Sequence, residues 1–454
     1  MTAFIQASHA GAAATRGMRS RPAIQPVGKR ALLILDWWEK LAGASLALSA
    51  VIRLCQATGA ALVTPSVRSS LFLPGPAKGA WPLSAYYDAG ALRGALAPQT
   101  LTSYAAWRQL SRHNGSRSLL LIVVYTEFPK ACSDMVRTDQ STCPSACLSL
   151  SGIQRLLKAA HKWVGDGLSQ MCVGAAEVRA GVAGRGRVAA LIRSHHATAL
   201  LNFRRHDGGR PMLPQVQAHA LRSLATRPSS AVRAAAHGLL AQHHIPPKTP
   251  YASVQLRSNH LAHAAYQQLY ALASSAVSTT VVSTSSATTS AASSTSTPAS
   301  TACAGRVVSC ARRLSRAMRR HAAASSTIVA SDLATLFRPN QDGETHRRKP
   351  YMKECLVPAL PALRRWYTSV GYSFNCSGAP AFDRARAARV SEGRASAADA
   401  CDAGWLGLVD WTLATEATWF AAIDVRTPWR SAFLEWIVMA RKAKGRASEL
   451  IACP

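Results

Sequence analysis

An early strand, helix and second strand are the feature that most constrains the fold of this chain. Residues 30–36, RALLILD, form a continuous apolar run, which is typical of a strand buried on both faces. Residues 44–58 carry apolar side chains at helical spacing, and Gly59 follows as a C-cap. Residues 61–65, ALVTP, indicate the next strand, with a loop expected over 37–43. This order is a βαβ unit, which predicts an α/β fold with a parallel sheet.

A second unit of this kind begins at residue 250. Polar and apolar residues alternate over 251–256, YASVQL, as in a pleated strand, and a helical pattern follows. Arg257 therefore stands at the carboxyl end of a strand, where open α/β sheets bind ligands. Its guanidinium is a permanently charged fork that matches phosphate oxygens. The sequence predicts that Arg257 anchors a nucleoside diphosphate, and a surface arginine at a strand end remains the alternative.

The length of 454 residues fits two domains. Residues 1–27 are polar and basic, and we expect them to be disordered. Residues 28–242 are predicted to form an N-terminal Rossmann-like domain and 243–454 a C-terminal one, with a proline-marked connection at 243–250. Residues 274–301 are almost only Ser, Thr, Ala and Val, which indicates a disordered insertion. Residues 175–187 show no clear periodicity.

Charge and cysteine content leave several classes open. The net charge of +31 favours a polyanionic partner or an anionic membrane surface, but the arginines are spread along the chain and do not form a dedicated arm. The 11 cysteines form no CxxC pair, so a zinc ribbon is not expected. Disulfides are expected if the chain is secretory, and the local pairs are 143/147, 303/310 and 376/401. Neither a signal peptide nor a transmembrane segment is predicted.

Four segments together resemble the GDP-fucose protein O-fucosyltransferase superfamily, in its divergent plant and algal members. They are RALLILDWWEKLAGASLALSAVIRLCQATGAALVTP, PLSAYYDAGALR, YASVQLRS, and VASD followed by LVDWTLATEATWFAAIDVRTPWRSAFLEWIVMAR. Their order and spacing carry the resemblance, which covers about half the chain. It implies two Rossmann-like domains facing across a cleft, the GT-B arrangement, with the donor nucleotide bound mainly by the C-terminal domain.

The resemblance also implies site residues. Arg257 matches the family's phosphate-binding arginine, Asp332 matches an acidic position near the nucleotide, and Ser431 and Phe433 match a turn that contacts the diphosphate. Gln255 stands where many members have His. In the first loop, Trp37 and Gly43 are expected to face the donor in place of the usual Gly/Asn pattern. Glu39 is a candidate base by position, with a solvated loop carboxylate as the alternative.

The implied function is a glycosyltransferase similar to O-fucosyltransferases. It would transfer a sugar, fucose by resemblance, from a GDP-sugar to a hydroxyl of a protein or glycan by inverting displacement. No Asp-x-Asp pair occurs, so neither a metal nor another cofactor is expected. The resemblance places such a protein in the endoplasmic reticulum or Golgi lumen. One alternative is an inactive carbohydrate- or nucleotide-binding relative, favoured by Gln255 and the first loop. Another is a polyanion-binding protein, although no nucleic acid partner is expected.

Overall fold

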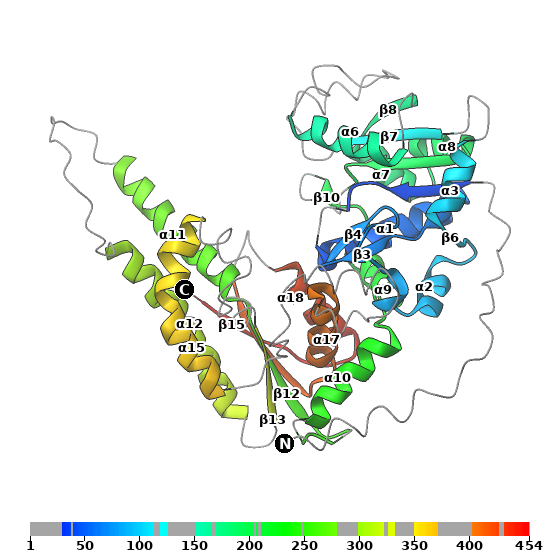
Figure 1. Ribbon diagram of the computed structural model, residues 1–454. Coiled ribbons are helices and arrows are strands. Elements are labelled where there is room, and N and C mark those ends of the chain that lie inside the picture. Colours follow the sequence, from blue (N-terminus) through cyan, green and yellow to red (C-terminus); the bar gives the residue numbers. More distant parts are fainter. Residues whose placement is uncertain are drawn as a thin grey trace.

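The computed structural model describes most of the chain (Figure 1). The described residues are 30–37, 40–112, 119–125, 151–164, 169–203, 206–207, 210–242, 244–246, 248–278, 298–321, 326–331, 349–370, 402–425 and 431–453. The predicted disordered start, 1–27, lies outside them, as do Glu39 and Asp332.

The N-terminal sheet has six parallel strands in the order β6-β2-β1-β9-β7-β8. These strands are β1 (Ala31–Ile34), β2 (Ala61–Val63), β6 (Leu101–Thr102), β7 (Leu119–Tyr125), β8 (Ser169–Gly174) and β9 (Ala197–Leu201). Successive residues of β1 face opposite sides: Leu32 and Ile34 join one hydrophobic cluster, and Ala31 and Leu33 join another. A sheet buried on both faces explains the continuous apolar run.

Helices cover both faces of this sheet. The helices of this half are α1 (Leu41–Thr58), α2 (Ala89–Leu96), α3 (Tyr104–Ser111), α6 (Ser151–Val164), α7 (Ala175–Val182), α8 (Gly186–Ser194), α9 (Gln215–Ala225) and α10 (Ser230–Gln242). The C-cap Gly59 has φ 72°, the left-handed conformation that glycine adopts without strain. Among the described helices, only α1 is long and apolar enough to span a membrane, and 78% of that stretch is buried inside the protein. It is the central core helix of this half.

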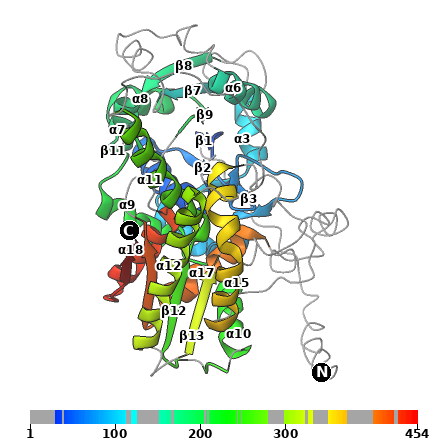
Figure 2. The same cartoon turned by 90° about the vertical axis from the view of Figure 1, so that its left-hand side faces the viewer.

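The C-terminal sheet has four parallel strands in the order β13-β12-β14-β15. They are β12 (Tyr251–Leu256), β13 (Ser326–Ser331), β14 (Trp419–Asp424) and β15 (Glu449–Ala452). On one face lie α11 (Ser258–Ser278), α12 (Pro298–His321), the π-helical turn η4 (Met352–Leu356) and α15 (Val357–Val370) (Figure 2). The other face is covered by α17 (Ala403–Glu416) and α18 (Ala432–Ala443). The prediction of an α/β fold built from two Rossmann-like parallel sheets is confirmed.

The two halves pack tightly against each other. Helix α10 precedes residue 243 yet packs on α17, and one hydrophobic cluster continues from the N-terminal sheet to the C-terminal sheet. The buried Arg222 on α9 donates to the Ala42 carbonyl (2.6 Å) and lies 4.3 Å from the ring centroid of Trp436 on α18. Asp402, just before α17, accepts hydrogen bonds from the Ser69 amide (2.8 Å) and the Tyr86 hydroxyl (2.5 Å).

Several local expectations are wrong. Residues 41–43 belong to α1 and not to a loop, because Leu41 and Ala42 are buried with the rest of that helix. Residues 175–187 contain helix α7 and the start of α8. The tract predicted as disordered is helical at both ends, since α11 extends to Ser278 and α12 begins at Pro298; residues 279–297 lie outside the described part. The small antiparallel strands β3 (Ser66–Arg68), β4 (Leu71–Leu73) and β5 (Trp81–Pro82), and β15, were not predicted.

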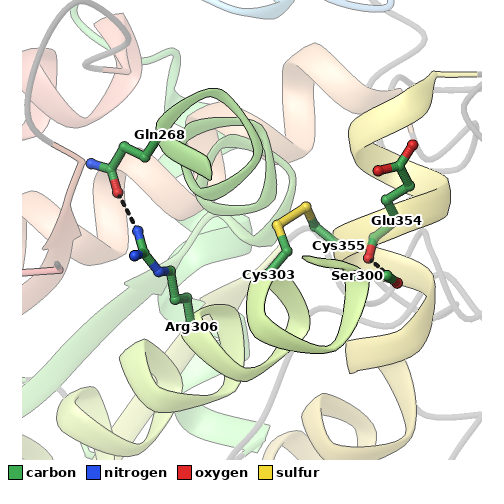
Figure 3. The surroundings of a disulfide bond; sticks show 6 residues. All are labelled: Gln268, Ser300, Cys303, Arg306, Glu354 and Cys355. Atoms are coloured by element: carbon green, nitrogen blue, oxygen red, sulfur yellow. Dashed lines mark hydrogen bonds between the residues drawn. A yellow bond between two sulfur atoms is a disulfide. The ribbon is translucent and has the colours of Figure 1, made fainter. Parts of the chain in front are cut away.

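Two disulfides tie α12 to its surroundings. Cys303 pairs with Cys355 of η4, as Figure 3 shows, and Cys310 pairs with Cys453 after β15. Cys303 and Cys310 are therefore not paired with each other, because both lie in α12 and are separated by about 10 Å along its axis, beyond the reach of a disulfide. The other local pairs, 143/147 and 376/401, lie outside the described residues.

Candidate functional site

A pocket opens at the carboxyl edge of the C-terminal sheet, between β12 and β14. The enclosed space is about 10 Å³, room for about one water molecule, and about 320 Å³ is reached only when the open solvent at the mouth is counted. The residues that line it come from three places in the sequence: Gln255, Arg257, His260, Ala422, Ile423, Val425, Ser431 and Leu434. Because β12 and β14 are parallel neighbours, their carboxyl ends meet at one edge and bring residues about 170 positions apart together.

The start of a helix closes one side of this pocket. Ser431 is the N-cap of α18, and its hydroxyl accepts from the Leu434 amide at 3.4 Å. The first turn of a helix presents backbone N–H groups that have no partner within the helix, and its dipole favours an anion. Helix α11 also begins beside the pocket, at Ser258 directly after Arg257. Among the described residues, the pocket thus combines the cation of Arg257 with two helix N-termini.

Arg257 contacts an aromatic ring and lies near a buried acid. Its guanidinium carbon lies 5.0 Å from the ring centroid of Phe433 on α18, within the range of a cation–π contact. The charge of Arg257 also acts on Asp410 of α17. Burial raises the pKa of Asp410 to about 7, and the nearby Arg257 opposes that rise. Arg257 therefore packs against α18, and its charge reaches Asp410 on α17.

Gln255 lies deeper in the pocket, two residues before Arg257 and on the same face of the strand. It is 5% exposed, and its Oε1 atom has no hydrogen-bond partner among the described residues. A buried carbonyl oxygen without a partner costs about 1–3 kcal/mol.

The remaining predicted residues have different positions. Trp37 is 4% exposed and packs against Phe72, with ring centroids 5.2 Å apart. Gly43 lies buried within α1. Neither residue lines the pocket. Asp332 and Glu39 lie outside the described residues, so the structure brings together Gln255, Arg257, Ser431 and Phe433.

Two residues near the pocket were not among those predicted. Asp410 is the single acidic residue within the apolar stretch of α17 before Glu416. Because a helix that is apolar on all sides is buried, an ionisable residue within it indicates a candidate site residue. His260 stands one helical turn after Arg257, and the i, i+3 spacing places both on one side of the first turn of α11. The sequence contained both signals.

Solved structures of other proteins resemble this fold, whereas sequence relatives were not found. No family model and no curated protein matches the sequence. Among solved structures, the apo form of POFUT1 and POFUT1 in complex with GDP-fucose each align with 94% of this chain and 99% of theirs, at a TM-score of 0.46 and 9% and 10% identity. The fucosyltransferase NodZ from Bradyrhizobium aligns with 91% of this chain and 92% of its own, at a TM-score of 0.35 and 12% identity.

Proposed function

We propose that this protein transfers a sugar from a nucleoside diphosphate to a hydroxyl group. The observation that carries the proposal is the meeting of Arg257 with the N-terminus of α18 in one pocket at the carboxyl edge of a parallel sheet. A diphosphate is the ligand that uses both features, since it carries two charged groups a few ångströms apart. One can face the guanidinium and the other the free amides of α18.

The reaction proposed is a single displacement. The oxygen of an acceptor hydroxyl attacks the anomeric carbon of the sugar, and the bond from that carbon to the phosphate oxygen breaks. Its electron pair leaves on the diphosphate, and the acceptor's proton passes to a base, for which Glu39 remains the candidate. Negative charge grows on the leaving phosphate, so a fixed cation beside it lowers the barrier. Arg257, which packs against Phe433, supplies that cation.

The resemblance in sequence narrows the donor to a GDP-sugar, with fucose as the sugar. The alternative of an inactive relative keeps the same pocket and differs only in turnover. The acceptor, a protein or a glycan hydroxyl, is proposed on the resemblance alone.

A nucleotide panel tests the proposal. Because a ligand that binds only the folded state raises its stability, GDP at about 100 times its Kd should stabilise the protein by about 2.7 kcal/mol in a thermal-shift assay. UDP and ADP at the same concentration should give smaller shifts. Release of GDP from GDP-fucose in the presence of acceptor would then separate an enzyme from an inactive relative. If no nucleoside diphosphate shifts the melting temperature, the pocket has another use.

A further inference from the structure

The exposed side of helix α12 carries an unusual run of arginines. Six of them, with no acidic residue anywhere in the helix, follow one side of its surface: Arg306, Arg312, Arg313, Arg316, Arg319 and Arg320. The opposite side is buried through Val307, Cys310 and Leu314. The helix is therefore fixed in rotation, and its arginines cannot turn away from solvent.

Half of these arginines brace the helix and half do not. Arg306 donates to the Gln268 side chain (3.1 Å, Figure 3), Arg313 to the Ala452 carbonyl (3.2 Å), and Arg320 pairs with Glu449 (2.8 Å). Arg312, Arg316 and Arg319 are exposed and make no hydrogen bond or ion pair with any described residue. Their i, i+4, i+7 spacing places them in one row about 10 Å long.

The surroundings of α12 restrict the shape of an anionic partner. The helix packs against both α11 and α15, and the three lie together over the sheet (Figure 2). Helices packed 8–10 Å apart make a layer roughly 30 Å wide, and a DNA major groove of about 12 Å admits one helix only. The exposed large hydrophobic residues in the described part of the chain are Val216, Leu224 and Val357, so this part offers no aromatic platform for single strands.

A broad, rigid and positive layer fits a planar anionic partner. Arg364 and Arg365 on α15 are also exposed and add positive charge to the same layer. The disulfide Cys303–Cys355 holds α12 against η4, so the helix that carries the row of arginines is already fixed in place. We propose that the α12 row formed by Arg312, Arg316 and Arg319 docks the protein onto an anionic phospholipid membrane surface. This surface lies on the opposite face of the sheet from α17 and α18 and is independent of the proposed transfer reaction.

Vesicle co-sedimentation with the full chain tests this proposal. The wild type should bind phosphatidylcholine vesicles that contain phosphatidylserine, fail to bind phosphatidylcholine alone, and dissociate as salt rises. Each arginine near such a surface contributes roughly fivefold in affinity, so the triple variant R312A/R316A/R319A should bind on the order of 100-fold more weakly. The triple Arg→Lys variant should bind nearly as well as the wild type, because the attraction needs charge and no fork geometry.

A matched control removes the same charge elsewhere. The variant R93A/R112A/R185A loses three exposed arginines of the N-terminal half. Its loss of vesicle affinity should be less than a tenth of the fold-change seen for R312A/R316A/R319A. Circular dichroism and thermal melting must show that both variants keep the wild-type fold. Equal weakening by the two triples would overturn the proposal, since net charge alone would then drive binding. Absence of vesicle binding, or an α12-dependent interaction with duplex DNA in place of vesicles, would overturn it as well.

Discussion

Replacing Asp402 by alanine should loosen the junction between the two halves of the protein. Its carboxylate accepts four hydrogen bonds: from the amides of Ser69, Gly404 and Trp405 and from the Tyr86 hydroxyl. Asp402 thus caps α17 and holds the β3–β4 turn, where Ser69 and Ser70 have φ 47° and 74°. The Asp402 side chain, which is 8% exposed, therefore links the two halves by hydrogen bonds.

The cost follows from these contacts. Loss of the N-cap costs about 1 kcal/mol. The Tyr86 hydroxyl, on a fully buried ring, would lose its partner and add about 1–3 kcal/mol. The expected loss in free energy of unfolding is therefore about 2–4 kcal/mol, measured by urea denaturation.

Asp88 supplies the matched control. It caps α2 by accepting from the Ala91 amide at 2.9 Å, but no buried hydroxyl depends on it. Asp88→Ala should cost only about 1 kcal/mol. A double-mutant cycle of Asp402→Ala with Tyr86→Phe should show a coupling of about 1 kcal/mol or more. The reasoning is refuted if Asp402→Ala costs no more than Asp88→Ala, or if the cycle shows no coupling.

Three further predictions concern stability. Burial raises the pKa of Asp410 to about 7, so between about pH 4 and pH 7 the folded state keeps a proton that the unfolded chain loses. The free energy of unfolding should therefore fall by at most about 4 kcal/mol as pH rises through this range. In urea titrations across the same range, the variant Asp410→Asn should not show this fall. Arg441 is fully buried, donates to the Ala414 and Ala417 carbonyls (2.8 and 2.7 Å), and has its pKa lowered by burial to about 10. Arg441→Met should therefore cost about 3 kcal/mol or more by thermal melting, whereas the exposed Lys442→Met should cost under about 0.5 kcal/mol. Peptide mapping without reductant should recover Cys303 linked to Cys355, and a link between Cys303 and Cys310 would contradict the structure. The variant Cys303→Ser should lower the free energy of unfolding by about 2–4 kcal/mol.

The parts of the fold that local patterns encode were predictable. The βαβ unit, the strand that ends at Arg257 and the helix that starts after Ser431 each depend on periodicity and capping within one segment. Parallel pairing then brings Arg257 and Ser431 to one pocket. Phe433 was predicted to belong to a turn that contacts the diphosphate; its contact with Arg257 was not predicted.

Other features depend on contacts between distant segments and could not be predicted locally. Strand β15 is four residues long and is defined by its pairing with β14. Cys303 finds Cys355 only once α12 packs on η4. Trp37 was expected to face the donor, but an aromatic side chain beside Phe72 gains more by joining the core. The sequence shows Asp410 as a lone acid in an apolar stretch, but it does not show that α17 brings this acid near Arg257.

Calorimetric titration of GDP into the wild type and Arg257→Ala tests the central claim most directly. Loss of a charge-assisted contact should cost about 1.5–3 kcal/mol, which is about 10- to 150-fold in Kd. Arg93→Ala, an exposed arginine of the N-terminal half, should leave the Kd unchanged. Arg93→Ala should melt at the wild-type temperature. Arg257→Ala should stay folded but melt slightly lower, because it loses the cation–π contact with Phe433. Equal GDP affinity in the wild type and Arg257→Ala would contradict the account, because the pocket would then not hold the diphosphate.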